Sequence, residues 1–331
     1  MSETFGDGAA QLEALRHRAE AGDPAAMTAF AKRLLVGKDA PFEPKEAVDL
    51  LGAAMALGDG EAASISANLA AAGAWRPQSW AEAFDLLALA AERGARLAQG
   101  QLRLLSGAPT GADDWRAMAA RIPLDAWLKP PPREPICEAP RIRVGRGFLP
   151  HAVCDWLMDR ARDNLQPAKM LEAYGDIPRL SGERTNSDFI IDIVTADVVL
   201  TLIRARISAF MEIPTIGFQP PQVLHYAVGQ ELKPHFDFLE RSVSEAVRAE
   251  LGNQIATVLI YLNDDYDGGE THFCRIDLRH KGAKGDAVAF ANLDRSGKPD
   301  PLTLHAGLAT TRGEKWLLSQ WIRDRPIAAS R

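Results

Sequence analysis

The first third of the chain repeats itself, and this internal repeat constrains the fold more than any other feature. Gly22, Gly58 and Gly94 stand 36 residues apart, and the segment Glu46–Leu51 recurs with the same step at Glu82–Leu87. The surrounding residues are rich in Ala and Leu, which favours helices. A repeat of this length, with glycine closing one helix before the next begins, is typical of stacked helix pairs. The sequence therefore predicts a helical solenoid over residues 11–107.

These repeats resemble the Sel-like branch of the tetratricopeptide superfamily. Solenoids of this kind present a concave face to another chain, so the resemblance implies a protein or peptide partner that the repeats recruit. The alternative is that the helical block only extends and stabilises the rest of the molecule.

Length and composition fit a two-domain globular protein. A chain of 331 residues is long enough to build two cores. The run Lys129-Pro-Pro-Pro-Arg-Glu-Pro135 is typical of a stiff, polyproline-like spacer. We therefore predict a helical-repeat domain at residues 1–123, a Pro-rich linker at 124–140 and a second domain at 141–331.

Charge and cysteine content exclude several classes of protein. The net charge is −6 and the pI is about 5.7, so no basic field favours nucleic acid or an anionic membrane. The amino-terminal residues show no signal-peptide pattern, and no apolar run approaches the ~18 residues of a spanning helix. Three widely spaced cysteines form neither a disulfide framework nor a Cys-x-x-Cys site. These features predict a cytoplasmic protein with reduced thiols.

The second half of the chain changes to short apolar segments separated by Gly, Asp and Asn turns. Helices are expected at about 151–165 and 195–211, and a polar helical insertion at 242–251. Short strands at such spacing favour a jelly roll over a parallel sheet, so the predicted fold class is α+β. The expected strands begin near Ile142 and continue at 189–194, 222–227, 233–238, 256–262, 268–273, 286–291, 302–305 and 315–323.

A His-x-Asp pair stands at the end of one of these strands. Of the seven histidines, only His235 is followed two residues later by a carboxylate, Asp237. Side chains at i and i+2 of a strand project from one face, so imidazole and carboxylate can converge. They would supply two members of a 2-His-1-carboxylate facial triad, which leaves coordination positions open on non-haem Fe(II). The best candidate for the third ligand is His305, 70 residues after His235.

The motifs from Gln222 to Trp321 resemble the catalytic core of the prolyl 4-hydroxylase branch of the 2-oxoglutarate/Fe(II) dioxygenases. The resemblance implies a double-stranded β-helix that binds Fe(II), the cosubstrate 2-oxoglutarate and O2, with ascorbate as a candidate reductant. It also implies hydroxylation with release of succinate and CO2. The matching pieces are Pro234-His-Phe-Asp237, Ala256-Thr-Val-Leu-Ile-Tyr-Leu-Asn263, Gly268-Gly-Glu-Thr271, Gly285-Asp-Ala-Val-Ala-Phe290, His305-Ala-Gly307, Arg312-Gly-Glu-Lys-Trp316 and Trp321.

The same resemblance assigns roles to individual side chains. His235, Asp237 and His305 would hold the metal. Lys315 matches the position that binds the far carboxylate of 2-oxoglutarate; Tyr261 and Thr271 could donate hydrogen bonds to that carboxylate, and Tyr226 matches a pocket tyrosine. The irregular segment 167–188 resembles a loop that closes over the substrate, which makes Arg184 a candidate substrate contact. One departure is Gln254, where the family commonly carries Arg, and it places a collagen-like or polyproline preference in doubt.

Three functions are consistent with these features. The first is hydroxylation of a protein or peptide, at proline, with a partner recruited by the repeats. The second is the same chemistry on a free amino acid or another small molecule. The third is a helical-repeat adaptor with an inactive jelly roll, and the presence of all four residues His235, Asp237, His305 and Lys315 argues against it.

Overall fold

The chain forms two compact units. The computed structural model describes residues 4–109, 111, 113–168, 184–238 and 252–326. One unit contains the chain up to Lys129 together with Asp192–Arg206, and the other contains Pro130–Ile191 and the residues from Ile207 onward. The predicted helical insertion at 242–251 and most of the predicted loop at 167–188 lie outside the described residues.

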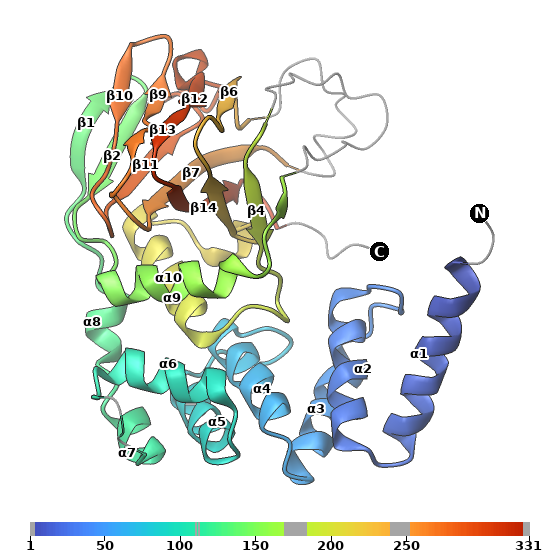
Figure 1. Cartoon of the computed structure of the whole chain (residues 1–331). Helices are drawn as coiled ribbons and strands as arrows, with labels where there is room; N and C mark the ends of the chain where they lie inside the picture. Colours follow the sequence, from blue (N-terminus) through green and yellow to red (C-terminus); the bar gives the residue numbers. More distant parts are fainter. Residues whose placement is uncertain (1–3, 110, 112, 169–183, 239–251, 327–331) are drawn as a thin grey trace. The chain divides into compact units, whose positions relative to one another are not determined.

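The helical unit is built from antiparallel helix pairs that follow one another along the chain, which confirms the predicted repeat (Figure 1). Gly22, Gly58 and Gly94 stand in the turns within the pairs with φ of +91°, +96° and +81°, a region that favours glycine. A Cβ at any of these positions would meet no atom within 4 Å, so backbone conformation rather than crowding requires the glycine. The helices of this unit are α1 (Thr4–Glu20), α2 (Pro24–Val36), α3 (Pro44–Ala56), α4 (Gly60–Ala72), α5 (Trp80–Glu92), α6 (Arg96–Ser106), α7 (Trp115–Ala120) and α8 (Leu124–Leu128).

Aspartate caps begin two of the helices, and small residues let the helices pack closely. Asp23 and Asp59 begin the second helix of their pairs, because each carboxylate accepts hydrogen bonds from two backbone N–H groups of the first turn. The core between the pairs consists largely of alanine with leucine filling the gaps, as the Ala positions of the repeat predicted. Its buried members include Ala26, Ala31, Leu34, Ala47, Leu51, Ala62 and Leu69.

A segment from the second half of the sequence completes the helical unit. Asp192–Arg206, which includes most of α10 (Val198–Met211), is counted with the repeats. Asn68 is 1% exposed; its Nδ2 donates to the carbonyl oxygen of Ile193 at 3.1 Å, and the Thr201 hydroxyl donates to its Oδ1 at 2.6 Å. The buried side chain of Gln101 accepts from the backbone N–H of Val198 at 2.9 Å. The repeat helices therefore use buried amide groups to hold a helix of their own chain.

Replacing Asn68 by alanine is expected to destabilise the protein by about 2 kcal/mol or more, because two partly buried groups lose their hydrogen bonds to a buried amide. Urea unfolding followed by circular dichroism measures this loss. Asn164→Ala is the matched control, since Asn164 is exposed and donates only to the carbonyl oxygen of Arg160. Equal stability of the two variants would contradict the assignment of segment 192–206 to the helical unit.

The second unit consists of antiparallel sheets. The larger sheet has the strand order β1-β2-β11-β7-β14-β5-β4-β3, and the smaller one has the order β10-β9-β12-β6. Strands β8 and β13 form a separate two-stranded ladder. The strands are β1 (Glu134–Glu138), β2 (Arg141–Gly145), β3 (Gln166–Pro167), β4 (Ser187–Ile190), β5 (Gln222–Tyr226), β6 (Leu232–His235), β7 (Gln254–Tyr261), β8 (Asp267–Gly268), β9 (Thr271–Phe273), β10 (Leu278–His280), β11 (Ala287–Ala291), β12 (His305–Gly307), β13 (Thr310–Arg312) and β14 (Lys315–Arg323).

One hydrophobic core fills the space between the two main sheets. Alternate residues of each long strand point into it, for example Leu259 and Tyr261 of β7, while Phe273 of β9 enters from the smaller sheet. This arrangement confirms the predicted jelly roll and the α+β class (Figure 1). Beside the sheets the unit contains α9 (His151–Arg162), η1 (Thr215–Gly217) and η2 (Pro301–Thr303).

Several local elements differ from the sequence-based expectations. The span 124–140 contains α8 and β1, so only Lys129–Arg133 and the turn Ala139–Pro140 lack helix or strand there. Strand β6 ends at His235 rather than at residue 238, and β12 begins at His305, where the predicted strand ended. No helix among the described residues has the length and apolar character needed to cross a bilayer.

Candidate metal centre

The two histidines of the predicted triad are direct neighbours across a strand pair. His235 is the last residue of β6 and His305 is the first of β12, and the antiparallel register places them opposite each other. Their ring centroids are 4.2 Å apart. Opposite residues on one face of an antiparallel ladder bring their side chains together, so the smaller sheet alone juxtaposes the two imidazoles.

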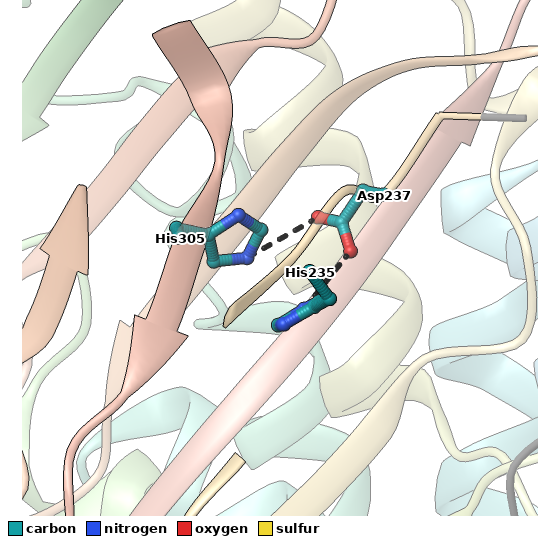
Figure 2. Close-up of side chains that lie close together, drawn as sticks. All are labelled: His235, Asp237 and His305. Carbon is teal, nitrogen blue, oxygen red and sulfur yellow. Dashed lines mark ion pairs between the residues drawn. The ribbon is translucent and has the colours of Figure 1, made fainter. Parts of the chain in front are cut away.

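The Asp237 carboxylate lies near both imidazoles, but a different backbone element from the predicted one places it there. Asp237 lies in a bend after the end of β6, so the strand alternation assumed from the sequence does not place it. Its Oδ1 is 3.6 Å from Nε2 of His235 and its Oδ2 is 3.8 Å from Nε2 of His305 (Figure 2). One ligand atom from each of the three residues lies within 4.8 Å of the others. The bend turns the carboxylate back toward both rings.

Backbone carbonyl groups orient both imidazoles. Nδ1 of His235 is 2.9 Å from the carbonyl oxygen of Lys233, and Nδ1 of His305 is 2.9 Å from that of Thr303. A carbonyl oxygen can only accept, so each Nδ1 carries a proton, and Nε2 is the nitrogen through which each ring can bind a metal. Both rings therefore turn Nε2 toward the Asp237 carboxylate, as metal-binding histidines require.

The charge states at this site suit a divalent cation. Burial and, to a smaller extent, His235 lower the pKa of His305 to about 4 against the opposing effect of Asp237, so the imidazole is neutral near pH 7. Burial alone would raise the pKa of Asp237, but the two histidines and the Thr257 hydroxyl outweigh it and lower that pKa below its usual range. Two neutral nitrogens and one carboxylate fit the donor set of Fe(II) and leave one residual positive charge.

A buried lysine lies at the same cavity. Lys315 of β14 is 1% exposed, and its ammonium donates a hydrogen bond to the carbonyl oxygen of Gly269 at 2.6 Å. Burial lowers the pKa of Lys315 to about 7, which Glu270 opposes and Lys281 reinforces. Tyr226 and Thr271 also line the cavity, and the ammonium lies 5.0 Å from the ring centroid of Tyr226. The metal-ligand candidates and a cation therefore share one interior space.

Tyr261 and Arg184 have different relations to this cavity. Tyr261 is fully buried and does not line it; its hydroxyl lies 3.0 Å from that of Thr271 and donates to the carbonyl oxygen of His280. Arg184 does line the cavity, where its Nε donates to Oδ1 of Asn186 and its Nη2 lies 3.6 Å from Oδ2 of Asp188. Of the residues predicted to bind the metal, 2-oxoglutarate or the substrate, only Tyr261 does not line the cavity; it contacts Thr271, which does.

Sequence reasoning missed some residues of the cavity. Thr257, Ser319 and Trp321 line it, and Thr257 donates a hydrogen bond to Oδ2 of Asp237 at 2.5 Å. The available signal was strand parity. Thr257 has the parity of the inward-facing Leu259, and Ser319 and Trp321 have that of Lys315.

Comparisons with known proteins agree with this geometry. The model of the 2OG-Fe(II) oxygenase superfamily matches residues 221–323. The chain is 31% identical over 207 residues to "Prolyl 4-hydroxylase 1" of Arabidopsis thaliana, which covers 58% of this chain and 72% of that protein. The chain belongs to the prolyl 4-hydroxylase family of 2-oxoglutarate/Fe(II) oxygenases. This oxygenase is therefore a dioxygenase that uses Fe(II), 2-oxoglutarate and O2.

Solved structures similar to this dioxygenase are also known. A viral collagen prolyl hydroxylase from Paramecium bursaria Chlorella virus-1 is 26% identical, with a TM-score of 0.44, and the match covers 57% of this chain and 98% of that one. A Sel1 repeat protein from Oxalobacter formigenes is 25% identical, with a TM-score of 0.28, over 33% of this chain and 88% of that one.

Proposed function

We propose that this dioxygenase hydroxylates an unactivated C–H bond of a prolyl residue in a protein or peptide and releases succinate and CO2. The observation that carries the proposal is the convergence of His235, Asp237 and His305 beside the buried Lys315. The name of the Arabidopsis relative, a prolyl 4-hydroxylase, supports proline as the target.

In this proposal His235, Asp237 and His305 hold Fe(II). When bound, iron supplies the redox chemistry that lets O2 react with a 2-oxo acid and a C–H bond. The protein's own contribution is orientation. The carbonyl groups of Lys233 and Thr303 keep each Nδ1 protonated, so neither ring has to change tautomer or rotate when the metal arrives.

Lys315 binds the far carboxylate of 2-oxoglutarate in this proposal. Its ammonium now donates to a single carbonyl oxygen, that of Gly269, and a carboxylate would provide the opposite charge that a buried cation requires. Thr271 and Tyr226 line the cavity beside it. Tyr261 acts through Thr271, because its hydroxyl contacts that of Thr271 and does not line the cavity.

The affinity for 2-oxoglutarate should depend on pH. Lys315 is charged in the complex, whereas burial lowers the pKa of its free form to about 7. Affinity is therefore level below that pH and falls by about tenfold per pH unit above it, because binding must take up a proton. Calorimetry between pH 6 and 9, in buffers of different ionisation enthalpy, measures both effects. A level wild-type profile without proton uptake would contradict the role of Lys315.

We further propose that the helical repeats recruit the protein substrate and that Arg184 contacts it. Arg184 lines the cavity beside β6 of the smaller sheet, where it forms an isolated bridge with Leu232, and its side chain is 10% exposed. Gln254 stands where the family commonly carries Arg, which places a collagen-like or polyproline preference in doubt. The proposed boundaries remain 1–123, 124–140 and 141–331. The three unpaired cysteines among the described residues suit a reducing, cytoplasmic location.

Succinate release by the full chain tests this function. Protein loaded with Fe(II) under anaerobic conditions receives 2-oxoglutarate, ascorbate and O2, with proline-containing peptides in one arm and free amino acids in another. We expect peptide-dependent succinate and a mass gain of one oxygen atom on proline. Turnover only with free amino acids would favour the small-molecule alternative. Folded protein without iron binding or turnover would favour the adaptor.

A further inference from the structure

The candidate ligand Asp237 is the end of a buried hydrogen-bonded chain that no part of the proposed function uses. Thr257 of β7 donates its hydroxyl proton to Oδ2 of Asp237 at 2.5 Å, and Nδ2 of Asn292 donates to Oγ1 of Thr257 at 3.1 Å. Asn292 is 0% exposed and Thr257 1% exposed. The three residues stand 20 and 35 positions apart in sequence, so only the folded sheets bring them together.

The direction of every proton in this chain is determined by chemistry. An ionised carboxylate only accepts, so the single hydroxyl proton of Thr257 must point to Asp237. The Thr257 oxygen then accepts, so Asn292 must present its NH2 group rather than its carbonyl oxygen. The orientation of the Asn292 amide is thus determined by the Asp237 carboxylate, which lies two hydrogen bonds away, and not by solvent.

The backbone of Asn292 is anchored on both sides. Its N–H donates to the carbonyl oxygen of Ile255 in β7, and its carbonyl oxygen accepts from the N–H of Asp300, each at 2.9 Å. Asp300 in turn caps η2, the short helix that leads into His305. The same residue therefore supports Asp237 through its side chain and the approach to His305 through its main chain.

We propose that Thr257 and Asn292 are positioning residues that restrict Asp237 to metal binding through a single oxygen. Oδ2 accepts a short, charge-assisted hydrogen bond, which leaves Oδ1 as the oxygen that is freer to bind the metal. A carboxylate that bound through both oxygens would fill one of the three positions that the triad leaves open. A 2-oxo acid that chelates and O2 need all three. This inference rests on the proposed metal site and adds a reason why three coordination positions stay open on the metal.

Co(II) binding tests the proposal on the full chain without turnover. Thr257→Val keeps the shape of the side chain and removes the donor, and we expect its Kd for Co(II) to rise about 10–100-fold with altered visible bands of the bound ion. Thr257→Ser restores the hydroxyl and should return to within about threefold of wild type. Asn292→Ala should show an intermediate loss, because the hydroxyl keeps its acceptor but loses its support.

Thr28→Val is the matched control. Thr28 in the helical unit is also 1% exposed and also donates to a carboxylate, Oδ2 of Asp59 at 2.8 Å, but Asp59 is no ligand candidate. Its Co(II) affinity and visible bands should equal those of wild type. If Thr257→Val or Asn292→Ala binds Co(II) as wild type does, with the same bands, the positioning role is wrong. Failure of wild type itself to bind would instead overturn the metal site.

Discussion

His235→Ala protein should bind no stoichiometric iron and release succinate at least about 10³-fold more slowly than wild type. The loss follows from the chemistry, since a metal ion supplies several kcal/mol of stabilisation and each 1.36 kcal/mol is tenfold in rate. Removing one of three ligands also leaves Asp237 buried beside a single imidazole, that of His305. Iron content by atomic absorption and succinate release measure the two effects separately.

His272→Ala provides the matched control for this experiment. His272 belongs to β9, which pairs with β12 in the same small sheet, but its Nε2 lies 3.0 Å from Oδ1 of Asp277 and it does not line the cavity. It should keep wild-type iron content and rate. Iron retention and turnover by His235→Ala would refute the assignment of the triad.

Lys315→Met should raise the Kd for 2-oxoglutarate by about 100-fold or more and leave metal binding unchanged. The variant removes the cation proposed to bind the far carboxylate, and truncating one partner of a buried, hydrogen-bonded charge pair costs about 2–5 kcal/mol. Isothermal titration of the Co(II)-loaded protein measures the affinity without chemistry. The volume of the side chain is nearly retained.

Stability separates a lost contact from a damaged fold in that experiment. Lys315 is 1% exposed, so in the ligand-free protein its ammonium is a desolvated charge, and methionine should leave the free energy of unfolding equal or higher. Lys298→Met is the control: Lys298 is exposed and does not line the cavity. If Lys315→Met binds 2-oxoglutarate with an unchanged Kd, another group must bind its far carboxylate.

The fold could be predicted from the sequence where local rules determine it. The glycine period gave the helix pairs, because a turn with positive φ is a local requirement. The segment 192–206 could not be assigned to the helical unit in this way. Its partners Asn68 and Gln101 are more than ninety residues away in the sequence. The only local sign of this contact is that Asn68, a polar residue, stands in an alanine-rich helix.

The site could be predicted in composition but only partly in geometry. His235, Asp237, His305 and Lys315 were identified by spacing and by resemblance, yet the reason given for Asp237 was wrong, because β6 ends before it. Thr257 could have been identified from strand parity alone. Asn292 could not, because its role depends on a contact between β7 and the residue that follows β11.

The opposition of His235 and His305 in the register of β6 and β12 has a consequence for sequence change in this family. The lengths of the loops between the two histidines can vary, since loops of different length can return the chain to the same pairing. A one-residue shift in the register of β12 would instead turn the His305 imidazole to the opposite face of the sheet, away from His235. Indels between the strands are thus expected to be frequent among relatives, whereas indels inside them should mark chains that no longer bind iron.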